Sequence, residues 1–432
     1  MMNIDELHKL YLKHPHVFTD SRKAEAGGIF FALKGERFDG NRFVADALND
    51  GADFAVTDDP AFNLREGCIV VDNVLKTLQL LAGYHRKFLG TPVLAITGTN
   101  GKTTTKELIR EVLTERYKVI STSGNLNNHI GVPLTLLSMR KEHEIAIVEM
   151  GANHLGEIAE LCAIAEPDYG LITNVGKAHL EGFGSFEGVK KTKGELYEYI
   201  ASNGKGIFIN ADNKHLEKMS VHNQIKYTYG SFSPGADLKG EPVDEQLFLV
   251  VKVLFPKGWL YMKSKLIGAY NFENIMAAAR IGLFFDIDPV KIQNAIASYE
   301  PDNNRSQLLK KSGANILIDC YNANPTSMQA SVKNFINIRH DNKVVVLGDM
   351  LELGAVSAVE HQRIVDLLKD AGIQKVFLVG HNFEKTQAPD CFKKFTNVEA
   401  LINELESLDW NNKLLLIKGS RGIKLEKIID YM

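Results

Sequence analysis

The stretch TGTNGKTTTK, Thr97 to Lys106, follows the apolar run Val93 to Ile96 and precedes a helical stretch that continues from Glu107. A glycine-rich turn between a strand and a helix presents unpaired backbone N–H groups and the positive end of a helix dipole to an anion. The order of strand, glycine turn and helix therefore predicts a phosphate-binding loop. The alternative is an ordinary Gly-Asn turn with an exposed lysine.

Each part of the predicted loop has a physical role. Gly98 and Gly101 permit the turn, Lys102 reaches the terminal phosphates of a nucleotide, and the Thr103 hydroxyl ligates Mg²⁺. The rest of the predicted ATP-binding loop comprises Thr99, Asn100 and Thr104. The common form GxxxxGK[ST] would place its first glycine where this chain has Ile96. Kinases, GTPases and ligases share such loops, so the loop does not name a reaction.

Composition excludes several function classes. The chain has 432 residues, 45% of them hydrophobic, which is enough for more than one domain. Fifty basic residues stand against 53 acidic ones, so no basic field is available for nucleic acid. The sequence has no apolar run of about 18 residues, and we expect no membrane span. Its start does not resemble a signal peptide, and its four scattered cysteines suit a cytoplasmic protein.

Apolar runs divide the chain into three predicted α/β domains. Residues 1–90 contain short strand candidates and end in a helical stretch from Val74 to Leu89. From 91 to 300, strand-like runs alternate with helical stretches, the pattern of βαβ units around a buried parallel sheet. Strand-like runs alternate with helical stretches again in residues 301–432, where we expect a doubly wound, Rossmann-like domain.

Seven further segments accompany the loop. They are GNLNNHIGVPLTLL (124–137), EMGANHLGEI (149–158), NVGKAHLEGFGS (174–185), KTKGELY (191–197), DCYNANPTSM (319–328), GDMLELG (348–354) and KGSR (418–421). With the loop form TGTNGKTT, they make the chain similar to the Mur ligase family, the ATP-dependent amide-forming enzymes of bacterial cell-wall precursor synthesis. The resemblance implies an N-terminal UDP-binding domain, a central ATPase domain and a C-terminal domain that closes on ATP and binds an incoming dipeptide.

The resemblance also implies two Mg²⁺ ions. Glu149 ends an apolar strand, where a carboxylate could hold Mg²⁺ on the nucleotide phosphates; by itself it could be a solvated strand end. His179 would ligate the second ion, although a lone histidine there could be an ordinary loop residue. Lys193 would serve as a carbamate, an oxygen ligand made by capture of CO₂, whereas charge pattern alone favours a solvated helix face. Lys102, His179 and Lys193 are the expected catalytic residues.

Binding residues are carried over in the same way. Asn271 and Asn274 have a spacing that places both amides on one helical face, as adenosine ligands or as a cap with a surface amide. The resemblance directs Asn274, Arg305 and Asp319 to ATP, with a hinge at residues 301–304. Further residues are expected to bind the other substrates: Ser21, Arg22, Lys34, Gly35 and Asp39 the UDP part, Asn127 and Asn128 the substrate path, and Tyr321, Asn322 and Asn324 the dipeptide. Without the resemblance, the first group would be a turn-rich solvated hairpin.

The implied reaction is the joining of D-alanyl-D-alanine to UDP-MurNAc-tripeptide through an acyl phosphate, by a cytoplasmic enzyme that works as a monomer. Within the family, the diamino-acid-adding ligase is the rival, but its DNPR-type signature is replaced by DCYNANPTS. Folylpolyglutamate synthase shares the loop but lacks a leading domain like residues 1–90. Outside the family, the alternatives are a P-loop kinase or NTP-driven switch and a silent nucleotide-binding module. For the third residue of the tripeptide, lysine and diaminopimelate are both alternatives.

Overall fold

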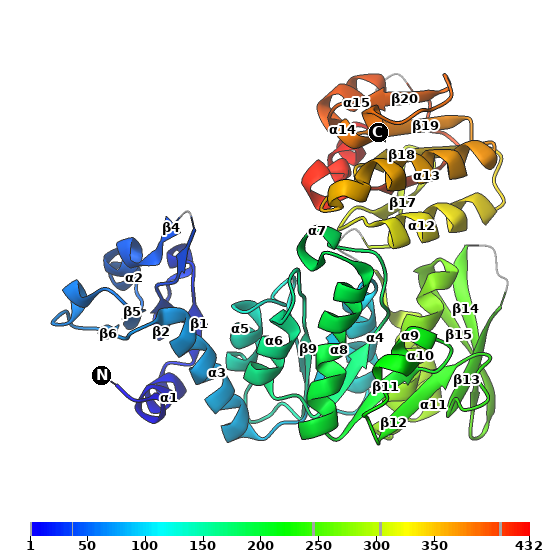
Figure 1. Ribbon diagram of the computed structural model, residues 1–432. Coiled ribbons are helices and arrows are strands. Elements are labelled where there is room, and N and C mark those ends of the chain that lie inside the picture. Colours follow the sequence, from blue (N-terminus) through cyan, green and yellow to red (C-terminus); the bar gives the residue numbers. More distant parts are fainter. Residues whose placement is uncertain (1, 37, 244–246, 302–304, 406–407) are drawn as a thin grey trace.

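A computed structural model describes residues 2–36, 38–243, 247–301, 305–405 and 408–432. Three lobes follow one another along the chain (Figure 1). The N-terminal lobe extends from one side of the central lobe, and the C-terminal lobe lies over another part of it. Residues 302–304 of the predicted hinge lie outside the described residues. No described helix has the length and apolar character that a membrane crossing requires.

The N-terminal lobe is built on a small parallel sheet of order β1-β2-β5-β6. The predicted helix from Val74 to Leu89 is confirmed as α3, which begins after the N-cap Asn73 and ends at Gly90 in the left-handed conformation. The elements are α1 (Ile4–Lys13), β1 (His16–Phe18), η1 (Ser21–Lys23), β2 (Gly28–Phe31), β3 (Lys34–Gly35), β4 (Phe38–Asp39), η2 (Gly40–Phe43), α2 (Val44–Asn49), β5 (Phe54–Thr57), η3 (Pro60–Phe62), β6 (Cys68–Val70) and α3 (Val74–Leu89).

The central lobe holds a nine-stranded sheet of order β15-β14-β13-β12-β11-β10-β7-β9-β8. Its strands are β7 (Val93–Thr97), β8 (Val119–Ser121), β9 (Ile145–Glu149), β10 (Tyr169–Ile172), β11 (Gly206–Asn210), β12 (Lys226–Gly230), β13 (Leu238–Val243), β14 (Phe248–Phe255) and β15 (Gly258–Ile267). Its helices are α4 (Lys102–Thr114), α5 (Gly131–Leu137), α6 (Glu157–Ala165), α7 (Leu180–Phe183), α8 (Phe186–Asn203), α9 (Lys214–Met219), η4 (Ala269–Asn271), α10 (Phe272–Phe284) and α11 (Pro289–Ser298). The four strands predicted from the sequence, β7, β9, β10 and β11, are parallel as expected. The antiparallel strands β14 and β15 extend the sheet at one edge and make it mixed.

Alternating side chains of β7 explain why this sheet is covered on both faces. Leu94 and Ile96 join one apolar cluster with residues of α4 and α10, whereas Val93 and Ala95 join a second with residues of α5, α6 and α8. A strand buried on both faces reads as a continuous apolar run, as VLAIT does. The second cluster also includes Leu7, Tyr11 and Leu78 of the N-terminal lobe, so one core crosses the boundary between the two lobes.

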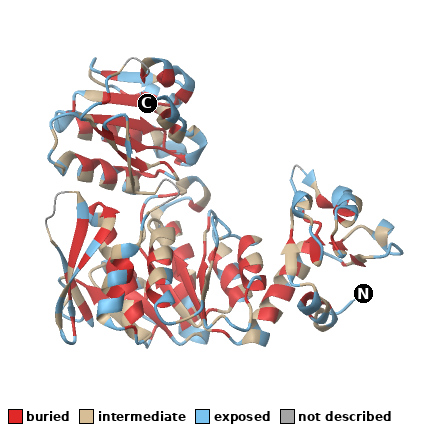
Figure 2. Ribbon diagram, turned by 180° about the vertical axis from the view of Figure 1, so that it is seen from behind, coloured by how far each residue is buried: buried red, intermediate tan, exposed pale blue. Residues whose placement is uncertain are grey.

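The C-terminal lobe carries a six-stranded sheet of order β16-β17-β21-β18-β19-β20, parallel except for β16. Its elements are β16 (Gln307–Lys311), β17 (Ala314–Asp319), α12 (Pro325–Asn337), β18 (Lys343–Gly348), η5 (Gly354–Val356), α13 (Ser357–Asp370), β19 (Lys375–Val379), α14 (His381–Glu384), β20 (Phe392–Phe395), α15 (Val398–Leu405), β21 (Leu414–Lys418), η6 (Arg421–Ile423) and η7 (Leu425–Tyr431). Buried strands lie between more exposed helices (Figure 2), which confirms the predicted α/β class.

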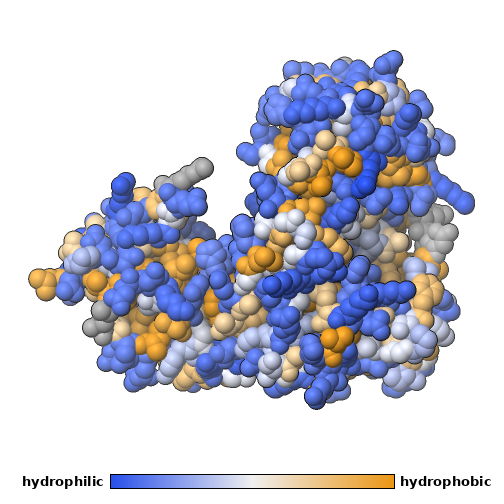
Figure 3. Space-filling model, in the orientation of Figure 1, coloured by the Kyte–Doolittle hydropathy of each residue, from blue (hydrophilic) through white to orange (hydrophobic). Residues whose placement is uncertain are grey.

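The surface of the molecule is mostly hydrophilic on the face shown in Figure 3. Hydrophobic side chains gather over the N-terminal lobe, and a hollow lies between this lobe and the C-terminal lobe. The carboxyl ends of the central parallel strands carry the loops that lead toward the C-terminal lobe, which is where open α/β sheets bind their ligands.

Candidate active site

The glycine-rich loop joins β7 to α4. Gly98 has a φ of +143°, and a Cβ atom there would lie 2.0 Å from Thr173 Oγ1. Gly101 caps α4 with a φ of +76°, and its Cβ atom would lie 2.6 Å from Asn274 Oδ1. Close packing thus requires glycine at both positions, and the first N–H groups of α4 have no partner within the helix. The loop has the backbone geometry of an anion site.

A buried carboxylate lies beside this loop. Glu149 is 2% exposed and ends β9, where it is the register partner of Ile96 in the neighbouring strand β7. Its two oxygens accept hydrogen bonds from Thr103 Oγ1 at 2.7 Å and from Asn127 Nδ2 at 2.8 Å. The adjacent parallel strands therefore bring Thr103 and Glu149 together at the start of α4.

Two predicted catalytic lysines face this region. Lys102 donates from Nζ to the carbonyl oxygens of Gly98 at 2.8 Å and Thr99 at 3.3 Å, and burial lowers its pKa. Lys193, on α8, is 3% exposed and makes no hydrogen bond or ion pair in the part of the chain that the structure describes. Burial, aided by the charge of Lys102, holds the pKa of Lys193 well below its usual range.

His179 precedes α7 and has a φ of +48°, an uncommon conformation for a residue with a side chain. Its Nδ1 contacts a carboxylate oxygen of Glu352, which comes from the C-terminal lobe and also has a positive φ, of +61°. Burial lowers the pKa of His179, and Glu352 opposes this effect. The contact joins the loop after β10 to the C-terminal lobe.

The donor set fits one Mg²⁺ ion directly. Thr103 and Glu149 supply adjacent oxygens beside the phosphate loop, which suits a hard cation that takes its other ligands from nucleotide phosphates and water. Within the described ranges, no group of three or more His, Cys, Asp and Glu side chains forms a metal centre. Lys193 has no lone pair as an ammonium, and Mg²⁺ prefers oxygen ligands to an amine nitrogen, so a carbamate is the form of Lys193 that would suit a second ion.

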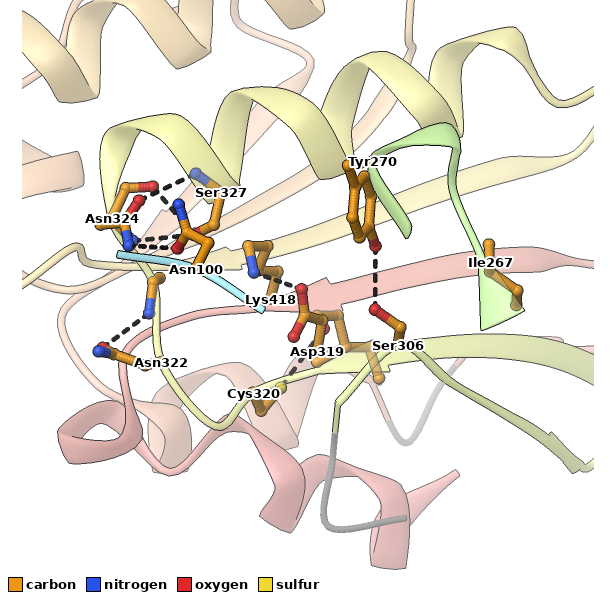
Figure 4. Close-up of polar contacts among 12 residues, drawn as sticks. Asn100, Ile267, Tyr270, Ser306, Asp319, Cys320, Asn322, Asn324, Ser327 and Lys418 are labelled. Carbon is orange, nitrogen blue, oxygen red and sulfur yellow. Dashed lines mark hydrogen bonds and ion pairs between the residues drawn. The ribbon is translucent and has the colours of Figure 1, made fainter. Parts of the chain in front are cut away.

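Side chains of the C-terminal lobe complete the site (Figure 4). Asn324 caps α12 by accepting from Ser327 N at 2.9 Å, and its Nδ2 donates to Asn100 Oδ1 at 2.8 Å. Asp319 ends β17 and pairs with Lys418, its register partner at the end of β21. The neighbouring parallel strands β17 and β21 thus each end in a charged residue, and the ion pair between these two residues faces the central lobe.

Asn274 has both polar atoms of its amide engaged. Its Oδ1 accepts from Thr105 Oγ1 at 2.9 Å, and its Nδ2 donates to Asn271 Oδ1 at 2.8 Å. The predicted placement of the two asparagines on one face is therefore correct. Their amides join α10 to α4, and Asn274 also closes the space behind Gly101.

Tyr321 follows β17 and interacts with two arginines. The guanidinium carbon of Arg305 lies 3.6 Å from the Tyr321 ring centroid, and that of Arg421 lies 5.5 Å from it. Arg305 Nε is buried and has no hydrogen-bond partner among the residues that the structure describes. An unpaired buried donor of this kind marks a place where a ligand can bind.

These residues share one cavity of about 920 Å³ between the central and C-terminal lobes. Every site residue predicted in these two lobes lines it: Gly98, Thr99, Asn100, Gly101, Lys102, Thr103, Thr104, Asn127, Asn128, Glu149, His179, Lys193, Asn274, Arg305, Asp319, Tyr321, Asn322 and Asn324. Tyr270, Glu352, Lys418 and Arg421 also line it, but the sequence analysis assigned none of them. The last three lie in the segments GDMLELG and KGSR. These segments indicated the family, but they did not indicate which of their residues line the cavity.

The five residues predicted for the UDP part lie apart from this cavity, in the N-terminal lobe. Lys34 forms an ion pair of 2.8 Å with Asp58, and Asp39 accepts from the Asn41 backbone N–H at 3.0 Å. Arg22 is exposed and pairs with Asp20. Ser21 begins η1 and Gly35 ends β3. The structure gathers these residues in one lobe without joining them to the cavity.

Comparison with known proteins decides the family. Three family models match: the Mur ligase family catalytic domain at residues 15–86, the Mur ligase middle domain at 96–282 and the Mur ligase glutamate ligase domain at 304–421. The chain belongs to the Mur ligase family. The UDP-N-acetylmuramoyl-tripeptide--D-alanyl-D-alanine ligase of Bacillus subtilis (strain 168) is 35% identical, covering 99% of this chain and 96% of the relative.

Solved structures of Mur ligases agree. MurF from Acinetobacter baumannii superimposes with a TM-score of 0.84 at 30% identity, over 96% of this chain and 92% of that one. MurF ligase from Thermotoga maritima, in complex with ADP, has a TM-score of 0.84 at 26% identity and covers 96% of both chains. The resemblance inferred from the sequence motifs is confirmed, and with it the ATP-dependent ligase activity of the family.

Proposed function

We propose that this Mur ligase joins D-alanyl-D-alanine to UDP-MurNAc-tripeptide, giving UDP-MurNAc-pentapeptide, ADP and phosphate. The observation that carries the proposal is the shared cavity, in which the phosphate loop and Glu149 of the central lobe face Tyr321 and Arg421 of the C-terminal lobe. Full-length relatives named for this ligase activity support the choice of substrates.

The reaction proceeds in two steps. The carboxylate at the end of the tripeptide attacks the γ-phosphorus of ATP, and the bond from this phosphorus to the bridging oxygen breaks. ADP is the leaving group, and the tripeptide becomes an acyl phosphate. The dipeptide amine then attacks the acyl carbon, loses a proton and expels phosphate as the amide forms. Two anions must approach in the first step, and Lys102 with the backbone N–H groups of residues 101–104, at the start of α4, would neutralise their charge. A closed cavity protects the acyl phosphate from water.

Mg²⁺ is part of the proposal. When bound, it would neutralise developing charge on the phosphates. Thr103 and Glu149 would hold one ion, and His179 with Lys193 would hold a second. Asn127 donates to Glu149 and would fix the orientation of that carboxylate.

A carbamate on Lys193 follows from the same requirement. Its neutral amine would attack CO₂ and lose a proton, leaving an anionic oxygen ligand. Burial favours the neutral amine, because it holds the Lys193 pKa well below the usual range. Enzyme incubated with ¹³C-bicarbonate should show a carbamate carbon resonance that is absent from Lys193→Arg. A spectrum with no difference between the two proteins would remove this part of the proposal.

Each lobe has a distinct task in this scheme. The domain of residues 1–90 would bind the UDP part through Ser21, Arg22, Lys34, Gly35 and Asp39. The domain of 91–300 would bind ATP and guide the tripeptide along Asn127 and Asn128. The domain of 301–432 would close onto ATP with Arg305 and Asp319, beside Asn274, and would bind the dipeptide with Tyr321, Asn322 and Asn324. We propose that the enzyme works as a monomer. The nucleotide-linked substrates suit a cytoplasmic enzyme.

Phosphate release measured with ATP, Mg²⁺ and UDP-MurNAc-tripeptide, with and without D-alanyl-D-alanine, tests the function. Release should require the dipeptide, and the nucleotide-sugar product should gain the mass of the dipeptide minus one water. ATP turnover indifferent to both substrates would instead favour a kinase or NTP-driven switch. Replacing the third residue of the tripeptide, lysine against diaminopimelate, measures the peptide preference.

A further inference from the structure

Two positive charges lie around one aromatic ring on the C-terminal side of the cavity. Arg305 and Arg421 both contact the face of Tyr321, and neither has an ion-pair partner among the described residues. Like charges in a partly enclosed site repel each other, so an anion placed there would be attracted to both. The ring holds the guanidinium groups in place through cation–π contacts.

The other cations lining the cavity are already engaged or face the phosphate loop. Lys102 donates to two carbonyl oxygens of the loop, and Lys418 pairs with Asp319. Lys193 is enclosed in the central lobe near Glu149. Arg305 lies close enough to Lys102 to help lower the pKa of that lysine, so it belongs to the phosphate side. Among the described lysines and arginines that line the cavity, Arg421 is the exposed one that remains.

The backbone next to Arg421 is held in place by hydrogen bonds. It begins η6, and the preceding residue Ser420 donates from Oγ to Ala323 O at 3.3 Å and accepts from Leu351 N at 3.0 Å. Ser420 N also donates to Asp349 O at 3.2 Å. The bond to Ala323 places the Arg421 turn directly beside the segment that carries Tyr321 and Asn322. A guanidinium on a rigid turn binds a carboxylate with two parallel hydrogen bonds and little loss of entropy.

We propose that Arg421 binds the free carboxylate of the incoming dipeptide, and so selects an acceptor that ends in a carboxylate. This inference rests on the proposed ligase function and adds a residue that recognises its second substrate. The dipeptide is a zwitterion whose amine must remain free to attack the acyl carbon. Its carboxylate is therefore the charged group available for binding, and the unpaired guanidinium beside Tyr321 matches it in charge and geometry.

The test compares two acceptors, D-alanyl-D-alanine and D-alanyl-D-alaninamide, which lacks the carboxylate charge. In the wild-type enzyme, the amide should have a KM about 10- to 100-fold higher, as expected for loss of a charge-assisted hydrogen-bonded pair. Arg421→Gln should raise the KM for D-alanyl-D-alanine by a similar factor but leave the KM for the amide unchanged. Arg421→Lys should recover part of the loss. The KM values for ATP and UDP-MurNAc-tripeptide should not change.

Lys424→Gln is the matched control, because Lys424 is exposed in the same segment and loses the same charge without lining the cavity. An Arg421→Gln enzyme that raises the KM for both acceptors equally, or that raises the KM for ATP, would overturn this proposal alone. A wild-type enzyme that accepts the amide as well as the dipeptide would overturn it without any variant. Wild-type phosphate release that ignores the dipeptide would overturn the ligase function as well.

Discussion

Asn324 of the C-terminal lobe donates a hydrogen bond of 2.8 Å to the side chain of Asn100 in the phosphate loop. The same residue caps α12, so the start of this helix is fixed to the loop that would hold the phosphates. Lys177 makes a further contact between the two lobes, an ion pair of 3.0 Å with Glu360. The arrangement of these two lobes is thus held in part by polar contacts that water could replace.

Asn324→Ser separates the two roles of Asn324. Serine still caps α12 but no longer reaches Asn100, so the KM for ATP should rise about fivefold while the melting temperature changes little. Asn324→Ala loses the cap as well and should unfold more easily by about 1 kcal/mol. Equal KM values for Asn324→Ser and the wild type would show that the inter-lobe bond does not assist ATP binding.

Gly98→Ala should abolish nucleotide binding. A methyl group there would lie 2.0 Å from Thr173 Oγ1, on a backbone with a φ of +143°, so the loop must move. We expect ADP affinity, measured by calorimetry, to fall about 100-fold or more, the size of effect typical for a displaced binding geometry. Gly90→Ala is the control, since Gly90 also has a positive φ but has no atom within 4 Å of the added methyl. It should cost about 1 kcal/mol of stability and leave ADP binding intact.

Glu149→Gln should raise the Mg²⁺ concentration needed for half-maximal phosphate release by about tenfold or more. The amide keeps the size of the carboxylate, but its NH₂ group cannot ligate a cation and its charge is lost. Titration of Mg²⁺ at saturating ATP measures the effect, and Glu142→Gln, on an exposed turn, serves as the control. An unchanged Mg²⁺ requirement would mean that the ion is held elsewhere.

His85 should make the protein less stable in acid. Its Nε2 lies 3.1 Å from Met139 O and must carry the proton, so Nδ1 accepts from His8 Nε2 at 3.0 Å. Burial lowers the pKa of His85 to about 4, against 6.5 in the unfolded chain. The unfolded chain therefore binds more protons between these values, and stability is full above pH 6.5 and falls as the pH drops toward 4.

The expected loss is up to about 3 kcal/mol of unfolding free energy. Urea unfolding at about pH 7.5 and about pH 5 measures it. In His85→Gln, the unfolding free energy should differ less between the two pH values than in the wild type. Some pH dependence will remain, because burial also lowers the pKa of His8. Equal pH dependence in His85→Gln and the wild type would contradict the assignment.

Local sequence patterns predicted the elements near the loop well. The apolar run from Val93 became β7, and the predicted helix of the first domain became α3. The antiparallel strands β14 and β15 were not predicted, because strand order and direction depend on pairing between distant segments. Only the fold could show that Glu352 meets His179, since 172 residues separate them in the chain and each lies in a different lobe. Motifs thus identified the loop and its neighbours, whereas contacts between lobes required the structure.

The apolar cluster that joins Leu7, Tyr11 and Leu78 to Val132 and Leu161 has a consequence for dissecting the protein. Cutting the chain near residue 90 would expose both halves of this cluster to water, and each fragment would tend to aggregate. By contrast, each face of the C-terminal sheet is covered by an apolar cluster drawn almost entirely from that lobe. Fragments for separate expression should therefore keep the first two lobes together. The N-terminal lobe has a sheet of its own, but it needs the central lobe to cover its apolar side chains and keep it soluble.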